Sequence, residues 1–263
     1  ASGALTIEAA NITVDADVNS TTANSFVLKA TGTITVNEDH TIRTNAGDII
    51  FWANAADGNT SGYILMGDGV TLNSINGSTS SGLSGGGDII LAGGSSVDGE
   101  GYPTGYAQSS SKFGVSLNGT RSDNKLFSAY SGGGDIRIYG KSTSPTSVAD
   151  SRDRVGVVTR GDLLLNSGTG RIDIRGVSEN FYGVNISNPI TNTASGPKLE
   201  IFSAAPMGTA IAIAGTSEST SYGVVFNYLN PKEILATAGG DISITGVTTG
   251  GTYGIFQSNT DVL

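Results

Sequence analysis

The stretch Gly133-Gly134-Asp135-Ile136-Arg137-Ile138-Tyr139-Gly140 alternates apolar and polar residues and has glycine at both ends. Alternation with a period of two is typical of a half-buried β-strand, and glycine suits the turns on either side of it. Close and looser copies of this phrase recur at 46–51, 86–91, 169–176, 208–215 and 239–246. A phrase that returns this often is an architectural repeat, so it indicates a fold before it indicates an active site.

Each copy in the second half of the chain belongs to a unit of three short strands separated by turn-forming residues. The strands predicted for the last three units are 162–165, 172–176 and 182–186, then 198–201, 211–215 and 222–226, then 233–236, 242–246 and 253–256. The segments 113–117 and 154–158 are earlier copies of the third strand, so the repeat spans at least 85–256. Because loop lengths vary, the period is irregular, roughly 30 to 45 residues.

Three short strands per unit, stacked unit on unit, predict an all-β chain that folds as a parallel β-helix. A single coil cannot bury its apolar side alone, so neighbouring coils stack and form one continuous core. A β-sandwich or propeller made of hairpins is the alternative, but the turn signals Asn76-Gly77 and Asn118-Gly119 do not separate strands of equal length. We expect one solenoid domain over 1–263, with compact coils in 1–84 and longer loops in 85–263.

The solenoid is expected to be a segment of a longer polypeptide. The start, Ala1-Ser2-Gly3-Ala4, carries no basic and apolar signal segment, and no cap is recognisable at either end. Open solenoid ends are sheet edges that invite pairing, so we expect contact with neighbouring domains or with further copies of the chain through these ends.

The repeat also predicts a register between neighbouring coils. In a parallel stack, equivalent positions lie about 4.8 Å apart, so outward neighbours must tolerate one another. Aligning 135–139 with 171–175 gives three attractive pairs, Asp135 with Arg171, Arg137 with Asp173 and Tyr139 with Arg175. The same alignment puts Asp88 beside Asp135, an unfavourable neighbour that either longer loops or a wrong alignment would explain.

The composition excludes several classes of function. A net charge of −9, with Lys and Arg scattered along the chain, gives no electrostatic reason to bind nucleic acid or an anionic membrane surface. No apolar run reaches the roughly 18 residues that a membrane-spanning helix needs. The absence of cysteine from a chain rich in Ser, Thr, Asn and Gly fits bacterial export, so we expect an extracellular or cell-surface location.

The order of these strand phrases, with Gly-Gly-Asp-Ile corners and Ser/Thr/Asn-rich loops, resembles bacterial filamentous-haemagglutinin-type exoproteins and related large surface adhesins. The residues that carry the resemblance are 28–36 and the copies at 47–51, 87–91, 134–138 and 240–244. The resemblance implies a secreted or cell-surface, right-handed parallel β-helix that acts in attachment or as a structural fibre. The secretion-recognition domain of that family is not evident in this sequence.

A polysaccharide lyase or hydrolase is the enzymatic alternative for a β-helix. Such a site needs clustered carboxylates, alone or with Arg or Lys, on one exposed sheet face. The candidate acids are Asp135, Asp150, Asp153, Asp162 and Asp173, with Arg152, Arg154 and Arg171 nearby in sequence. The segment 150–154 alternates in sign, which favours a solvated corner over a catalytic site. The repeated Asp of Gly-Gly-Asp-Ile is interpreted as a turn residue that accepts backbone N–H bonds beside glycines of positive φ, so no residue is assigned a catalytic role.

Metal and cofactor chemistry finds little support in the sequence, and no metal or cofactor site is assigned. His40 is the only histidine in the sequence, and it lies in a predicted exposed turn. One histidine excludes a histidine-based metal cluster, and no second histidine is available for a Ser-His-Asp triad. Calcium is a weak candidate, because Gly67-Asp68-Gly69 and Asp98-Gly99-Glu100-Gly101 carry oxygen ligands but the calcium-binding nonapeptide does not recur. Trp52 follows a strand end and is interpreted as corner packing rather than as a platform for sugars.

The sequence therefore predicts a non-enzymatic, extracellular β-solenoid that serves as an adhesin or as the building block of a surface fibre. Its expected partners are host, cell-surface or matrix glycans and, through the solenoid ends, other copies or domains. A carbohydrate-active enzyme or a carbohydrate-binding module is the alternative.

Overall fold

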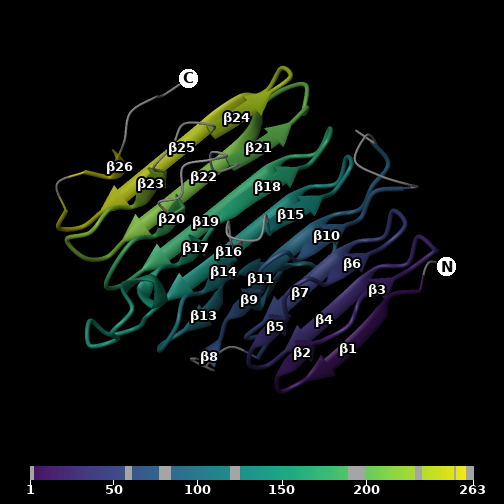
Figure 1. Cartoon of the computed structure of the whole chain (residues 1–263), viewed down its shortest axis with the longest axis horizontal. Helices are drawn as coiled ribbons and strands as arrows, with labels where there is room; N and C mark the ends of the chain where they lie inside the picture. The colour runs from purple at the N-terminus through teal and green to yellow at the C-terminus, as the bar shows by residue number, and fades with distance from the viewer. Residues whose placement is uncertain are drawn as a thin grey trace.

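A computed structural model of the chain describes residues 3–56, 61–76, 84–118, 125–188, 199–228, 233–251 and 253–258. These residues form a right-handed parallel β-helix with three strands per coil, as the sequence predicted (Figure 1). Among the described residues, the one helical element is a single 3₁₀ turn, η1 (Ser151–Arg154).

Successive strands of each coil belong to three sheets, which we name A, B and C in chain order. Sheet A stacks β1 (Leu5–Ala9), β4 (Phe26–Ala30), β7 (Ile49–Ala53), β11 (Ile89–Val97), β16 (Ile136–Ser142), β19 (Ile172–Ser178), β22 (Thr209–Ser217) and β25 (Asp241–Thr248). Sheet B stacks β2 (Ile12–Val14), β5 (Ile34–Val36), β9 (Ile64–Met66), β14 (Val115–Leu117), β17 (Val157–Thr159), β20 (Val184–Asn188), β23 (Val224–Tyr228) and β26 (Ile255–Ser258). Sheet C stacks β3 (Val18–Asn19), β6 (Thr41–Arg43), β10 (Thr71–Asn73), β15 (Leu126–Tyr130), β18 (Asp162–Asn166), β21 (Leu199–Ser203) and β24 (Glu233–Thr237).

Alternate residues of the three sheets point inward and form one continuous apolar core. In sheet A, for example, Ile136, Ile172 and Ile211 lie one above another and are at most 1 % exposed. Burying an isoleucine side chain is worth about 1.5 to 3 kcal/mol, so a column of them repeated along the rod is the main stabilising force. Because every strand contributes to this core, apolar and polar residues alternate in the strands even where the loops between them differ in length.

The predicted register between 135–139 and 171–175 is confirmed, because Arg137 pairs with Asp173 and Tyr139 with Arg175 along the strands. Of the three predicted side-chain contacts, however, one forms: the Arg175 guanidinium lies 4.8 Å from the centre of the Tyr139 ring. The other two are wrong. Asp135 accepts the backbone N–H of Arg171 (2.9 Å) rather than its guanidinium, and Arg137 turns back toward the preceding coil instead of reaching Asp173.

Two columns of Ser and Thr hydroxyls run inside the corners of the solenoid. At the corner from sheet C to sheet A, the hydroxyls of Ser131, Ser167 and Thr237 donate to the carbonyl oxygen three residues ahead, at 2.5, 2.8 and 2.6 Å. At the corner from sheet A to sheet B, the hydroxyls of stacked residues such as Ser178 accept backbone N–H groups two and three residues ahead. Because these polar groups satisfy turn atoms, a serine can be buried there at little cost.

The second glycine of the Gly-Gly-Asp phrase is needed for close approach between coils rather than for its own φ. A Cβ atom on Gly134 would lie 2.2 Å from the carbonyl oxygen of Gly87, and one on Gly170 would lie 1.9 Å from that of Gly134. Positive φ occurs one position earlier, at Gly133 (φ 116°). The sequence interpretation, which gave positive φ to both glycines, is therefore corrected for the second.

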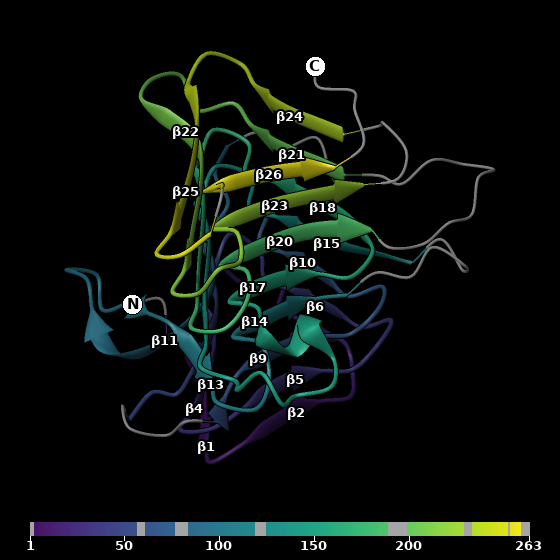
Figure 2. The same ribbon diagram turned by 90° about the vertical axis from the view of Figure 1, so that its left-hand side faces the viewer.

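The segment 93–111, interpreted from sequence as a loop, is largely strand. β11 runs on to Val97 and turns back as β12 (Pro103–Gly105), which pairs with it antiparallel, and the chain then forms β13 (Ala107–Ser109) between β16 and the short β8 (Ser61–Gly62). We name residues 93–106 the hairpin. It projects from the stack in Figure 2, and its Tyr102 and Tyr106 pack on the outward-facing apolar side chains of sheet A.

Core-facing residues are exposed at the two ends of the stack. Leu5 and Ile7 are 56 % and 42 % exposed in the first coil, and Ile242 and Ile255 are 41 % and 44 % exposed in the last. Within the described ranges, none of the helical structure is long and apolar enough to cross a membrane.

Candidate functional site

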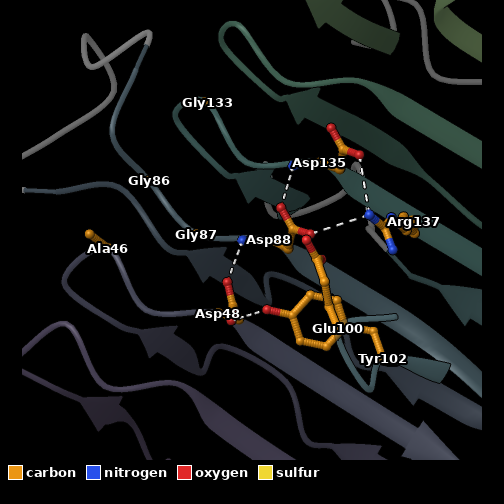
Figure 3. Close-up of a pocket in the computed structure, with 10 residues that line it drawn as sticks. All are labelled: Ala46, Asp48, Gly86, Gly87, Asp88, Glu100, Tyr102, Gly133, Asp135 and Arg137. Atoms are coloured by element: carbon orange, nitrogen blue, oxygen red, sulfur yellow. Dashed lines mark hydrogen bonds and ion pairs between the residues drawn. The ribbon is translucent and has the colours of Figure 1, made fainter. Parts of the chain in front are cut away.

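A shallow hollow of about 710 Å³ lies on the outer face of sheet A, where chain segments enter that sheet from sheet C. Its lining comes from three consecutive coils and from the hairpin (Figure 3). The lining residues are Ala46, Asp48, Gly86, Gly87, Asp88, Glu100, Tyr102, Gly133, Asp135 and Arg137. Three of them, Asp48, Asp88 and Asp135, are the aspartates of the repeated Gly-Asp-Ile phrase, one above another in the stack.

Each of these three aspartates accepts a backbone N–H from the next coil. The carboxylate of Asp48 accepts the N–H of Asp88 (2.9 Å), and that of Asp88 accepts the N–H of Asp135 (2.7 Å). The column continues through the N–H of Arg171. The sequence interpretation was right that this aspartate accepts backbone N–H groups, but wrong that it does so within its own turn. We name this arrangement the aspartate column.

The hairpin is fixed to the aspartate column by charged and polar contacts. The Tyr102 hydroxyl donates to Asp48 (2.6 Å), and Asp98 accepts a hydrogen bond from Arg137 Nη1 (2.9 Å). Burial, followed by the hydrogen bond to Asp48, raises the pKa of Tyr102 above its usual range, so the hydroxyl stays a donor. Glu100 is exposed at the turn of the hairpin and completes the rim.

Negative charge outweighs positive charge in the hollow, because four carboxylates (Asp48, Asp88, Glu100 and Asp135) line it with a single guanidinium, Arg137. Arg137 Nη2 lies 3.5 Å from Asp88 and 3.4 Å from Asp135, between the two carboxylates. This guanidinium and the N–H group of Asp135 relieve the repulsion between Asp88 and Asp135. The strands are aligned as predicted. The pair is therefore explained neither by longer loops nor by a wrong alignment.

Asp88 is a carboxyl group that ionises less readily than usual. Burial raises its pKa from 3.8 to about 6, and the charges of Asp135 and Asp48 act in the same direction, against the opposing hydrogen bond from Asp135 and the charge of Arg137. An aspartate whose folded-state pKa lies above its unfolded value destabilises the fold once it ionises. The loss of stability therefore develops as the pH rises from about 4 to above 6.

We expect Asp88→Asn to raise the free energy of unfolding at pH 8 by about 1 to 2 kcal/mol, after allowing for partial solvent exposure. The amide oxygen still accepts the Asp135 N–H, while the unfavourable charge is gone. The gain should fall to nothing at about pH 2.5, where Asp88 is protonated in both the folded and the unfolded wild type. Urea denaturation at several pH values measures this difference, with Glu8→Gln on the same sheet face as the control. A variant less stable than wild type at pH 8 would contradict the expectation.

The two calcium candidates are not arranged as metal sites. The Asp98 carboxylate accepts the N–H groups of Glu100 (3.0 Å) and Tyr102 (2.9 Å) as well as Arg137, so it closes the hairpin turn. Burial alone would raise the pKa of Asp98, but these hydrogen bonds outweigh it and keep the pKa below its usual value. Gly67-Asp68-Gly69 is the corner between β9 and β10, with Gly69 at φ 74°. No group of three or more potential ligands among the described residues is placed to hold a metal ion.

The charged segment 150–154 is partly buried, which corrects its interpretation as a solvated corner. It forms η1, and Asp153 is only 7 % exposed. Asp153 binds Lys112 (2.8 Å) and Arg160 (2.7 Å), so its carboxylate holds the β16–β17 connection on the stack. Asp150 lies at the start of η1, where the hydrogen bond that it accepts from Arg152 lowers its pKa to about 2.

The candidate acids do not converge on one site. Asp135 immediately precedes β16 and Asp173 lies in the neighbouring strand β19 of sheet A. Asp150 and Asp153 lie at the corner from sheet A to sheet B, and Asp162 begins β18 in sheet C. Asp173 binds Arg175 (2.6 Å) and the Tyr139 hydroxyl (2.8 Å). Arg154 lies over the ring of Phe181, 4.9 Å from its centre.

Trp52 and His40 differ from their sequence interpretations in position and in exposure. Trp52 lies within β7 on the outer face of sheet A rather than at a corner, and its indole N–H donates to the Gly94 carbonyl of the hairpin (2.6 Å). His40 follows a turn but is only partly exposed, because it lies between Asp15 and Asp17 at 3.6 and 3.4 Å. The hydrogen bonds that these aspartates accept, from Asn37 and Thr41 first and then from His40, lower the pKa of both.

Sequence reasoning did not single out Asp48, Asp88 or Tyr102 as parts of one hollow. The repeated aspartate was the available signal, since its recurrence in parallel coils requires the carboxylates to stack. No comparable sequence pattern indicated that the hairpin would place Tyr102 in this hollow. No protein-family model, no curated protein and no solved structure matches this chain.

Proposed function

We propose that this chain is a non-enzymatic, extracellular β-solenoid that acts at a bacterial cell surface as an adhesive or structural rod. The observation that carries the proposal is the aspartate column. These carboxylates could in principle serve catalysis, but each accepts a backbone N–H group from the next coil, and this hydrogen bond stabilises the stack of coils. The other buried candidate acid, Asp153, is bound by two cations.

Three features of the sequence support the location and the role. The chain has no cysteine, it is rich in Ser, Thr, Asn and Gly, and its strand phrases resemble those of filamentous-haemagglutinin-type exoproteins. The buried hydroxyl columns and the single core give a rod whose length is set by the number of coils. A rod of this kind can present loops and hairpins at a distance from a surface.

A carbohydrate-active enzyme is the second candidate, and one observation favours it. Asp88 lies in a surface hollow with its pKa raised to about 6, and a raised pKa is a property of general acids in glycoside hydrolases. We favour the structural role because a carboxylate of Asp88 that moved to protonate a substrate would give up the N–H of Asp135.

Incubation with a panel of neutral and acidic polysaccharides, followed by assays for reducing ends and unsaturated products, separates the two candidates. We expect no turnover between pH 5 and pH 8. Turnover that Asp88→Asn or Asp153→Asn abolishes, with the variant still folded, would refute the non-enzymatic proposal. Wild type heated above its unfolding transition serves as the blank.

The proposal extends to the two ends of the stack, where Leu5 and Ile242 are exposed core positions. We propose that another β-coil, from a neighbouring domain or from a second copy, covers each of these faces. Electron microscopy of untagged protein over a range of concentrations measures self-stacking directly. Rods whose length grows with concentration indicate a second copy, and discrete rods of one length at every concentration exclude it.

A further inference from the structure

The hollow on sheet A contains polar groups whose contacts with one another are long. Arg137 Nη2 is shared between Asp88 Oδ2 and Asp135 Oδ2 at 3.5 and 3.4 Å, whereas charge-assisted hydrogen bonds have lengths of about 2.7 to 2.9 Å. The other nitrogen, Nη1, already has a close partner in Asp98 at 2.9 Å. Nη2 and the two Oδ2 atoms therefore have hydrogen-bonding capacity that the protein itself uses poorly.

We propose that this hollow binds a neutral oligosaccharide, with ligand hydroxyl groups that bridge Arg137 Nη2 and the Oδ2 atoms of Asp88 and Asp135 from the open side of the hollow. A hydroxyl group suits this position because it can accept from the guanidinium and donate to a carboxylate at once. Two adjacent hydroxyls of one sugar ring would serve both carboxylates. The inference rests on the proposed adhesive function and names the class of its ligand.

The shape of the hollow suits such a ligand. It is shallow and polar, with a volume of about 710 Å³, so it suits a hydroxyl-rich ligand that lies along the surface. Gly86, Gly87 and Gly133 line part of it without side chains, so a sugar ring can approach the backbone there. The Tyr102 ring stands at the side of the hollow, with its hydroxyl on Asp48, and offers an apolar surface (Figure 3).

Charge selects among glycans. Four carboxylates against one guanidinium repel uronic acids, sialic acids and sulfated sugars, so a neutral glycan is favoured over an acidic one.

The aromatic residues beside sheet B are a poorer site for sugars. The rings of Tyr182 and Tyr222 are stacked at 5.7 Å and those of Tyr222 and Phe256 at 4.6 Å. Because each ring covers a face of the next, the flat surfaces that would stack on a sugar are occupied within the protein.

Binding should be linked to protonation of Asp88. The groups that face its carboxylate are Asp48 from the preceding coil, Asp135 and Arg137 from the following one, and Tyr102, Glu100 and Asp98 from the hairpin. A ligand hydroxyl that donates to Asp88 stabilises the ionised carboxylate, so binding lowers its pKa. Affinity should therefore rise as the pH increases from 5 to 8, through the pKa of about 6.

The test begins with a glycan array that carries neutral and acidic oligosaccharides, followed by titration calorimetry with the best neutral one at pH 5 and pH 8. We expect binding to neutral glycans, tighter at pH 8. Asp135→Asn keeps an oxygen for the Arg171 N–H and replaces Oδ2 by an NH₂ group that cannot accept, so we expect its affinity to fall at least about tenfold. Asp173→Asn, one coil further along the same sheet face, is the matched control and should bind as wild type does.

The inference is refuted if wild type binds no neutral glycan at millimolar concentration, if it binds acidic glycans alone, or if Asp135→Asn binds like Asp173→Asn. Circular dichroism and thermal unfolding of both variants exclude misfolding as the cause of a loss. These failures leave the proposed structural role standing, since that role is tested by the absence of turnover. Turnover of the bound glycan would instead refute the non-enzymatic proposal and keep the site.

Discussion

Gly170→Ala is expected to destabilise the solenoid by about 3 kcal/mol or more. Its new Cβ would lie 1.9 Å from the carbonyl oxygen and 2.4 Å from the carbonyl carbon of Gly134 in the preceding coil. These are backbone atoms, which cannot turn aside as the end of a flexible side chain can. The coils would have to separate locally, and the midpoint of thermal unfolding should fall by roughly 6 to 12 °C.

Gly99→Ala is the matched control, because nothing lies within 4 Å of the Cβ that would be added there. Its stability should stay within about 0.5 kcal/mol of wild type. Circular dichroism followed during heating compares the three proteins. An unchanged midpoint for Gly170→Ala would show that the coils are further apart at this corner than the structure places them.

Asp153→Asn is expected to cost about 2 to 3 kcal/mol of stability. The substitution keeps the volume of the side chain and removes its charge, leaving Lys112 and Arg160 without their shared counter-ion. Arg160 is the more affected of the two, because its side chain is 20 % exposed while that of Lys112 is 45 % exposed. Arg160 then keeps its longer contact with Asp150 (3.8 Å), which compensates less of its desolvation cost.

Asp150→Asn tests whether the position of the charge matters, since Asp150 lies in the same segment and its side chain is 36 % exposed. We expect a loss of about 1 kcal/mol or less there, because exposed ion pairs contribute little. Chemical denaturation of both variants at pH 7 gives the comparison. Equal losses would mean that Asp153 is solvated, as the sequence pattern alone suggested.

The fold and the register could be predicted from the sequence because both follow from short-range patterns that repeat. Ile136 and Ile138 alternate with polar residues, and Ile172 and Ile174 do so in the next coil, so one alignment puts all four in the core. Stacking by a fixed distance then fixes every other neighbour in the strand. A pattern that recurs along a chain carries information about contacts that are distant in sequence.

The candidate site was less predictable because it depends on groups whose positions the repeat does not set. Arg137 has a long side chain, and its choice of Asp98 and Asp88 over Asp173 depends on the hairpin, which occurs in one coil alone among those described. The hairpin itself, rich in Gly and Ser, lacks the alternation that marks the other strands. The burial of Asp153 likewise results from how one irregular connection folds back.

The hydroxyl column at the corner from sheet C to sheet A bears on the order in which the protein folds. Ser131, Ser167 and Thr237 each close a turn with an acceptor three residues away, so the bend can form before a neighbouring coil is present. The aspartate column, by contrast, needs the N–H of the next coil. Growth from a first folded coil would therefore add turns that are already bent. At Ser131 and Ser167, the carboxylate of the preceding coil, Asp88 or Asp135, then accepts an N–H group of the new coil.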